Sequence, residues 1–261
     1  MRRIIICNPK KTVTLSVTGT DCDLKCAHCG RHFLFGMRTI KEALDTKAES
    51  YLISGGCTKD GNVPIDEKTL KKLKNKGARL NIHSGLVTEQ QAMLLGRYAD
   101  TISFDFVYDD NTIDEVYGMK KTKDDYLRSY RFLKKHAKKV VPHICIGLNG
   151  GKLSGEKEAI DALFTEGTTE VTFLVFMPIQ GTIFENCNPP KEEDVFFVFR
   201  YARERLKNAR INLGCMRPRR LYDIAAVKAG LDCIVIPSRK AIELCEELKI
   251  HIEKKDDCCS L

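Results

Sequence analysis

Three cysteines, Cys22, Cys26 and Cys29, stand in one polar stretch and are spaced three and then two residues apart. Three thiolates on one loop can hold three irons of a cubic 4Fe–4S cluster, which leaves the fourth iron open to another ligand. Zinc is the main alternative on spacing alone, because it takes four ligands and His28 or His32 can complete the set. A chance grouping of buried thiols is less favoured, because the stretch is polar and ends in glycine.

The composition favours a cytoplasmic protein whose cysteines serve a metal or catalysis. The chain has 261 residues and twelve cysteines. The N-terminus lacks the long apolar region of a signal peptide, and no segment has the length of a membrane span. In a reducing compartment, clustered cysteines usually bind metals or act in catalysis rather than form disulfides. The net charge of +8 suits a lysine-rich solvated surface or docking to an acidic partner, and we expect neither nucleic acid nor membrane as a partner.

Short β-rich apolar runs alternate eight times with helical patterns, one of which opens with a Thr88–Gln91 capping box. Strict alternation favours a parallel sheet, and eight repeats favour an α/β fold of the closed (β/α)8 TIM-barrel type. We expect one barrel domain over 1–253 and a short cysteine-containing C-terminal tail at 254–261. The predicted strands are 12–17, 51–54, 79–83, 101–106, 140–147, 171–176, 211–214 and 233–237. The clearest predicted helices are 88–99, 122–139, 192–208 and 240–253.

Functional groups of such a barrel gather at the C-terminal ends of the strands. The loop 18–38, after the first predicted strand, holds the cysteine triplet. The other residues expected at this rim are Gly55, Gly56, Cys57, His83, Asp105, Cys187, Cys215 and Arg217.

The C-x3-C-x2-C spacing on the first loop of a β/α barrel resembles the radical S-adenosylmethionine superfamily. The resemblance implies a 4Fe–4S cluster on Cys22, Cys26 and Cys29 whose open iron binds S-adenosylmethionine. It also implies reductive cleavage of S-adenosylmethionine to methionine and a 5′-deoxyadenosyl radical, which removes hydrogen from an unactivated carbon. The absent fourth cysteine then leaves the position at which S-adenosylmethionine binds.

The resemblance extends to residues expected around S-adenosylmethionine. Gly55 and Gly56 match the segment that meets the methionine amino group, although Cys57 stands where the family often has Glu. His28 takes the place of the aromatic residue near the adenine, and Asp105 that of the polar residue near the ribose. A core or capping role for Asp105 is an equal alternative.

Two further segments have matches in the same family. The glycine-rich stretch 144–156 resembles one that lies against the adenine, although loop geometry alone can account for its glycines. Arg217, Arg219 and Arg220 can bind a carboxylate of S-adenosylmethionine or of the substrate, or they can form an ordinary solvated surface.

The motifs LISGGC, FMPIQGT, GCMRPRR and GLDCIVIPS are similar to those of biotin-synthase-related proteins, a group that includes the two-protein type of lipoyl synthase. This resemblance implies an auxiliary 4Fe–4S cluster that is dismantled to supply sulfur, and therefore further cysteines facing the same cavity. The expected auxiliary ligands are Cys57, Cys215, Cys258 and Cys259, with Cys145 and Cys187 in reserve. Of these, Cys258 and Cys259 lie on a tail that can fold back over the barrel mouth. Cys233 and Cys245 are expected to be core thiols, and Cys7 to lie near the barrel floor.

A lipoyl synthase is a sulfurtransferase of lipoate biosynthesis that inserts sulfur into unactivated C–H bonds of an octanoyl chain. The resemblance implies an acidic lipoyl-carrier protein or domain as substrate, a second radical S-adenosylmethionine subunit, and a reductant such as ferredoxin. One alternative is a radical S-adenosylmethionine enzyme without sulfur insertion, such as a mutase or cofactor maturase, which needs no second cluster. Another is a non-catalytic iron–sulfur or zinc protein, which does not cleave S-adenosylmethionine.

Overall fold

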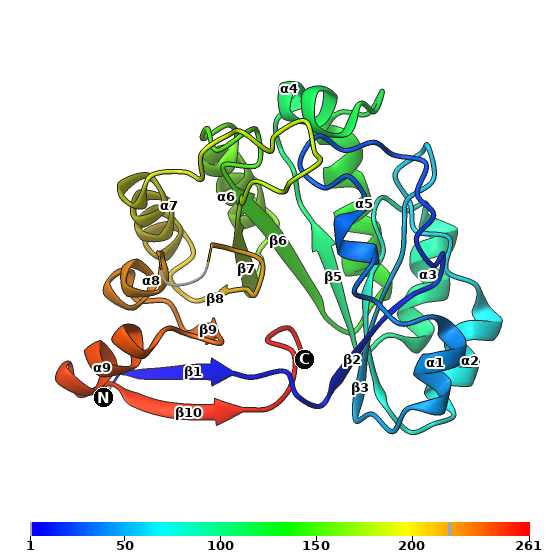
Figure 1. The fold of residues 1–261 in the computed structure, drawn as a ribbon, viewed down its shortest axis with the longest axis horizontal. Helices are drawn as coiled ribbons and strands as arrows, with labels where there is room; N and C mark the ends of the chain where they lie inside the picture. Colours follow the sequence, from blue (N-terminus) through cyan, green and yellow to red (C-terminus); the bar gives the residue numbers. More distant parts are fainter. Residues whose placement is uncertain (1, 219–220) are drawn as a thin grey trace.

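Parallel pairing runs through the whole sheet of this protein. The computed structural model describes residues 2–218 and 221–261, and within them ten strands form one sheet in the order β10-β1-β9-β8-β7-β6-β5-β4-β3-β2. The strands are β1 (Arg3–Cys7), β2 (Thr12–Ser16), β3 (Ser50–Ser54), β4 (Arg79–His83), β5 (Thr101–Asp105), β6 (Val140–Ile146), β7 (Glu170–Val175), β8 (Arg210–Leu213), β9 (Cys233–Val235) and β10 (His251–Lys255). The sheet curls into a half-barrel with helices on its outer face (Figure 1).

A helix or helical turn follows every strand from β2 to β9. This is the alternation that the sequence predicts, and all eight predicted strands are present within two residues of their expected ends. The helical elements are η1 (His32–Leu34), α1 (Ile40–Asp45), α2 (Glu67–Lys74), α3 (Glu89–Tyr98), α4 (Asp110–Thr112), η2 (Ile113–Tyr117), α5 (Lys123–His136), α6 (Glu156–Thr165), α7 (Glu192–Arg205), α8 (Asp223–Ala229) and α9 (Arg239–Glu247). No helix in the described part of the chain is long and apolar enough to cross a membrane.

The prediction of a parallel α/β sheet is confirmed, but the closed (β/α)8 barrel is not. Among the described residues, β2 and β10 form the two edges of the sheet, and no strand pairing joins them. Two additional strands extend the sheet at one edge: β1 pairs with β9, and β10 pairs with β1 (Figure 1).

The main core lies between the sheet and the helices. The side chains of Tyr51, Phe104 and Phe173 on the strands are fully buried, as is Phe199 on α7. The ring centroids of Phe173 and Phe199 lie 5.6 Å apart. The buried residues of α7, which are Val195, Val198, Phe199 and Ala202, therefore form the face that packs on the sheet.

The start of α3 and the end of α9 can be compared directly with the helix boundaries that the sequence predicts. The predicted capping box of α3 is present, since Gln91 N–H donates to Thr88 Oγ1 (3.3 Å) and Thr88 N–H donates to Gln91 Oε1 (2.8 Å). The predicted helix 240–253 is too long, because α9 ends at Glu247 and Lys249 takes a left-handed conformation (φ 52°). Apolar residues continue at helical spacing after Lys249, but Ile252 belongs to the strand β10, which pairs with β1.

The C-terminal tail enters the concave side of the sheet (Figure 1). Cys258 N–H donates to Thr12 Oγ1 (3.1 Å), and Thr101 Oγ1 donates to Ser260 O (3.1 Å). Thr12 and Thr101 are the first residues of β2 and β5. The tail therefore lies against the N-terminal ends of these strands. The expectation from the sequence, which places it over the rim at their C-terminal ends, is wrong. The predicted boundary between domain and tail at 253/254 falls inside β10.

A buried ion pair fixes the segment that follows β8. Arg217 and Asp223 expose 3% and 1% of their surface, and Arg217 Nε donates to Asp223 Oδ1 (2.9 Å). Arg217 Nη2 also donates to Val235 O (2.8 Å), and Asp223 Oδ2 accepts from Ser238 N–H (2.6 Å). The pair thus joins the start of α8 to both ends of the β9–α9 connection.

We expect Arg217→Met to lower the free energy of unfolding by about 3–5 kcal/mol, because it leaves the Asp223 carboxylate buried without its cation. Urea denaturation measures the change. The matched control is Arg239→Ala, which removes an exposed pair between Arg239 and Glu243 on α9 (2.7 Å) and should cost about 0.3–0.5 kcal/mol. Equal small changes in both variants would contradict the role given to the buried pair.

Candidate functional site

The cysteine loop after β2 is fastened to the end of β3. Thr18 Oγ1 accepts from Gly56 N–H (2.7 Å) and donates to Asp21 O (2.8 Å). Asp23 N–H donates to Cys57 O (2.8 Å), and Cys57 N–H donates to Cys22 Sγ (3.3 Å). The loops after β2 and β3 therefore hold each other at the C-terminal rim.

The three cysteines of the triplet are half-buried and face one another at this rim. Burial and the neighbouring thiols Cys29, Cys57 and Cys22 together raise the pKa of Cys26 far above its usual value. Burial also raises the pKa of Cys29, while the backbone N–H groups of residues 31–33 act in the opposite direction. A bound cation favours the thiolates that burial alone disfavours, so this donor set suits a metal centre.

The residues present suit a 4Fe–4S cluster, because three thiols on one loop can each bind one iron and leave the fourth open. As they stand, no three or more His, Cys, Asp or Glu side chains in the described part of the chain are arranged to hold a metal ion. Cys22 and Cys29 also receive backbone N–H groups, which stabilise thiolate sulfur.

Gly56 has a steric reason to be glycine. A Cβ atom at this position would lie 1.9 Å from Asp21 O and 2.5 Å from Cys22 Cβ. At Gly55 the nearest atom, Val17 Cγ2, would lie at 3.0 Å. The close approach to the cysteine loop therefore requires Gly56, and contact with the methionine amino group stays a prediction for both glycines.

A polar group lies beside the triplet, on the ends of β4 to β6. Asp105, the last residue of β5, keeps 53% of its side chain exposed, and its Oδ2 lies 3.9 Å from His83 Nδ1. The rings of His83 and His143 meet edge to face with centroids 5.0 Å apart. Burial lowers the pKa of both histidines to about 4. The pKa of Asp105 is raised by the partial loss of hydration at the rim, although half of its side chain still reaches solvent. The histidines are thus neutral near pH 7, when one ring nitrogen of each is able to accept a hydrogen bond.

His28 stands within the cysteine loop, between Cys26 and Cys29, and packs against η2. Its ring meets Tyr117 edge to face with centroids 5.6 Å apart. Burial lowers the pKa of His28 to about 4, and His28 Nδ1 is a buried atom without a hydrogen-bond partner in the described structure. An unsatisfied buried nitrogen calls for a partner, and a polar ligand group at this rim can supply it.

The structure divides the four cysteines predicted to hold an auxiliary cluster. Cys57 lies with the triplet, where it interacts with Cys22 and Cys29. Cys258 and Cys259 lie on the tail, against the opposite ends of the strands. Cys215, which is exposed after β8, interacts electrostatically with Cys259.

The reserve ligands Cys145 and Cys187 belong to the rim. Burial and the nearby Asp105 carboxylate raise the pKa of Cys145. Cys187 lies beside the glycine-rich turn after β6, because a Cβ atom on Gly150 would be 3.2 Å from its sulfur. Glu156 closes this turn by accepting from Gly147 N–H (2.8 Å) and Ser154 N–H (2.6 Å).

The arginines after β8 differ from the expected picture. The Arg217 guanidinium is buried and already paired with Asp223, Val235 O and Gly214 O. This pairing is a structural role, and binding of a ligand carboxylate by Arg217 stays a prediction. Arg219 and Arg220 lie outside the described residues.

Sequence reasoning missed two side chains of this site, His143 and Tyr117. His143 stands inside β6 in register with Asp105 of β5, so the pairing of predicted strands can locate it once the register is known. Tyr117 ends the short element η2, whose sequence signals are the Asp109 side chain that caps the preceding α4 and Gly118, which follows η2 in a left-handed conformation.

The fold has counterparts among solved structures, although the sequence matches no protein-family model and no curated protein. Methylornithine synthase (PylB) superposes with a TM-score of 0.64 at 14% identity, over 96% of this chain and 84% of that protein. The FeFe-hydrogenase maturase HydG from Carboxydothermus hydrogenoformans superposes with a TM-score of 0.66 at 16% identity, over 96% of this chain and 68% of that protein.

A third structure, Streptococcus suis SuiB bound to S-adenosylmethionine, superposes with a TM-score of 0.57 at 16% identity. The match covers 85% of this chain but only 52% of SuiB, so the chain spans about half the length of that protein. These identities are low, and the likeness therefore establishes the fold: the chain has the α/β half-barrel of these enzymes.

We expect Gly56→Ala to lower the free energy of unfolding by about 1–3 kcal/mol, because its Cβ must displace the cysteine loop. Urea denaturation of the metal-free protein measures the change, and limited proteolysis reports on release of loop 18–38. The control is Gly36→Ala in the same loop, where a Cβ meets nothing within 4 Å. Equal behaviour of the two variants would remove the steric argument for Gly56.

Proposed function

We propose that this chain is a radical S-adenosylmethionine enzyme. The observation that carries the proposal is the convergence of Cys22, Cys26 and Cys29, half-buried and supplied with backbone N–H donors, at the C-terminal rim of the half-barrel. The fold supports it, because SuiB, a solved structure of similar fold, is bound to S-adenosylmethionine. A 4Fe–4S cluster with S-adenosylmethionine supplies a carbon-centred radical that removes hydrogen from an unactivated carbon.

The chain's own residues bind and orient the reactants in this proposal. Gly55 and Gly56 offer backbone to the methionine part of S-adenosylmethionine, and Asp105 accepts hydrogen bonds from the ribose hydroxyls. His28 Nδ1, buried without a partner in the described structure, hydrogen-bonds the adenine. The neutral rings of His83 and His143 line the interior without adding charge. The curled sheet keeps bulk water from the radical.

We further propose sulfur insertion of the lipoyl synthase type as the reaction. The support is the cysteine content, because nine of the twelve cysteines lie outside the triplet and some are free to hold an auxiliary cluster that donates sulfur. The substrate is an octanoyl chain on an acidic lipoyl-carrier domain, which the net charge of +8 attracts. A second radical S-adenosylmethionine subunit and a ferredoxin-like reductant complete the system. Sulfur-free radical chemistry, as in a mutase or maturase, is the alternative.

Reconstituted, dithionite-reduced protein should convert S-adenosylmethionine into methionine and 5′-deoxyadenosine, measured by liquid chromatography. Cys26→Ala should lose about 4 irons per chain and reduce this cleavage to background, because the cluster loses a ligand. The control is Cys245→Ala on α9, a buried cysteine far along the chain from the triplet, which should keep both iron and cleavage. Wild-type cleavage in Cys26→Ala, or none in fully loaded wild type, would overturn the proposal.

Sulfur insertion predicts a distinct product. With an octanoylated carrier domain and reductant, the wild-type protein should release a carrier that is heavier by one or two sulfur atoms, detected by intact-protein mass spectrometry. A carrier with a neutralised acidic face should show a higher KM, because the basic enzyme no longer attracts it. Cleavage of S-adenosylmethionine without any sulfur-containing product favours the sulfur-free alternative.

A further inference from the structure

Three polar side chains, on the neighbouring strands β4, β5 and β6, leave the same face of the sheet. Asp105 is the register partner of His143, and His83 is the register partner of Ser103, which stands two residues before Asp105. Side chains two residues apart on a strand point to one face. His83, Asp105 and His143 therefore face the concave side, because the alternating residues of these strands pack in the core under the helices: Ile82, Phe104 and Ile144.

A main-chain carbonyl fixes which ring nitrogen of His143 can accept a hydrogen bond. His143 Nδ1 lies 2.9 Å from Val141 O. A carbonyl oxygen only accepts, so Nδ1 carries the hydrogen and Nε2 carries the lone pair of the neutral ring. His143 exposes 7% of its surface, and Nε2 has no hydrogen-bond partner in the described structure. The ring thus holds a fixed acceptor without a donor.

His83 and Asp105 are open in the same way. The 3.9 Å between His83 Nδ1 and Asp105 Oδ2 is longer than a hydrogen bond, so each atom keeps room for a third group. No Lys or Arg of the described residues pairs with Asp105. Its charge acts on groups that are themselves neutral or acidic, which are Cys57, Cys145, Tyr117 and Tyr126. Acceptors and a negative charge meet here without a compensating cation.

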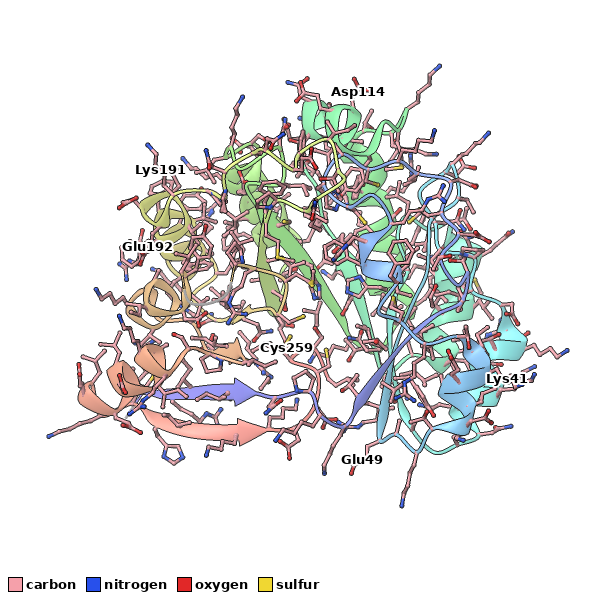
Figure 2. The ribbon with its side chains drawn as sticks, viewed as in Figure 1. Lys41, Glu49, Asp114, Lys191, Glu192 and Cys259 are labelled. Atoms are coloured by element: carbon pink, nitrogen blue, oxygen red, sulfur yellow. The ribbon has the colours of Figure 1, made fainter. Side chains whose placement is uncertain are left out.

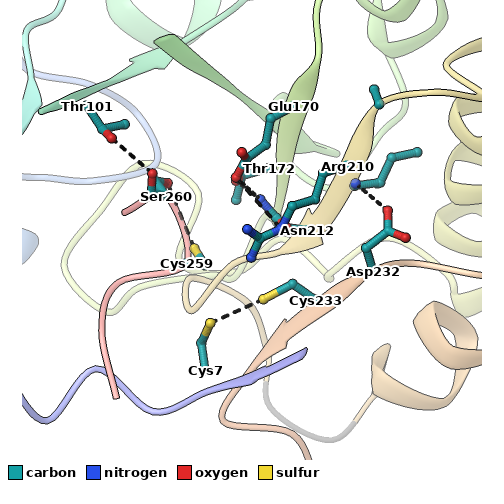
Figure 3. Close-up of polar contacts among 12 residues, drawn as sticks. Cys7, Thr101, Glu170, Thr172, Arg210, Asn212, Asp232, Cys233, Cys259 and Ser260 are labelled. Atoms are coloured by element: carbon teal, nitrogen blue, oxygen red, sulfur yellow. Dashed lines mark hydrogen bonds and ion pairs between the residues drawn. The ribbon is translucent and has the colours of Figure 1, made fainter. Parts of the chain in front are cut away.

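Elsewhere on the sheet, buried polar side chains have partners within the protein. Asn212 Nδ2 donates to Glu170 Oε1 (2.9 Å) and to Thr172 Oγ1 (3.2 Å), as Figure 3 shows. In the same view, the sulfur atoms of Cys7 and Cys233 face each other at 3.3 Å. Buried polar groups need hydrogen-bond partners, so the open acceptors of the histidine pair call for a donor from a ligand.

This acceptor group lies beside the place where the radical is proposed to form. Asp105 acts electrostatically on Cys57, and Cys57 interacts with Cys22 and Cys29 of the triplet. A molecule held by the histidine pair is therefore within reach of that radical.

We propose that His83 and His143 hold a nitrogen of the substrate, which donates its N–H hydrogens to their ring nitrogens, and that Asp105 Oδ2 balances any positive charge on it. Two sources share this chemistry: the amide N–H of an octanoyl chain on its carrier, and the ammonium of a free amine. The first fits the proposed sulfur insertion and the second fits the sulfur-free alternative. The inference rests on the proposed function only for the radical step that follows binding, and Asp105 Oδ1 stays available for the ribose.

The assigned acceptor is tested first, on the full chain labelled with 15N-histidine. Two-bond nitrogen–proton correlation spectra near pH 7 should show His143 as a neutral ring with its hydrogen on Nδ1. A protonated His143, or a neutral ring with its hydrogen on Nε2, removes the acceptor and overturns the proposal.

Ligand binding is then measured by calorimetry on the anaerobically reconstituted full chain, without reductant, so that no turnover occurs. The probes with N–H hydrogens are octylammonium and N-methyloctanamide, and their matched counterparts without N–H are octyltrimethylammonium and N,N-dimethyloctanamide. At least one N–H probe should bind about tenfold more tightly than its counterpart. His143→Phe should abolish this preference. The control His136→Phe, at a histidine of α5 whose Nε2 lies 3.0 Å from Glu89 Oε1, should keep it.

His83→Phe is the second variant and should also weaken the preference for N–H, and circular dichroism confirms that each variant is folded. A preference confined to the amide assigns the acyl carrier as the source, and one confined to the ammonium assigns a free amine. Equal binding of N–H and methylated probes to wild type, or an unchanged preference in both histidine variants, overturns the proposal. N–H-selective binding without cleavage of S-adenosylmethionine by reduced protein would reject the proposed function and keep this site.

Discussion

Parallel pairing is the constraint on which the rest of the structure depends. Because all strands run in one direction, the loops that leave β2, β3 and β5 meet at one rim and bring the cysteine triplet, Gly56 and Asp105 together. The same constraint gathers the strand starts at the opposite end, where Thr12, Arg79 and Thr101 receive the tail. One sheet thus presents two chemically distinct ends, with the triplet at one and the tail, which carries Cys259 (labelled in Figure 2), at the other.

The electrostatics of the two ends follow one rule. Burial disfavours the thiolate, and raises the pKa of Cys57 to about 12 in the absence of a metal. What the protein contributes is a set of donors that favours negative sulfur: backbone N–H groups at Cys22 and Cys29, the Arg210 side chain at Cys233, and the Asn81 side chain at Cys258. A bound cation would complete the compensation, since its positive charge reverses the effect of burial.

The sequence predicts the local elements of this protein well and its long-range pairings poorly. The Thr88–Gln91 capping box and the helical pattern over 192–208 are local signals, and both appear as expected. The order of strands beyond β8 is not local, because β1 pairs with β9 and β10 across nearly the whole chain. The meeting of Cys7 with Cys233 depends on that pairing, so spacing gives no sign of it. The triplet is different, since three ligands on one short loop need no tertiary contact to be recognised.

The edge formed by β1, β9 and β10 has a consequence for folding. From β2 to β8 each strand pairs with the next along the chain, whereas Cys7 and Cys233 are 226 residues apart. Closing so long a loop adds little to the free-energy cost of folding, but it delays the contact. We therefore expect the pairing of β1 with β9 and β10 to form last. Until β1 docks, β9 presents an unpaired edge that can recruit another chain. The yield of native protein then depends on how quickly the first strand finds the last ones.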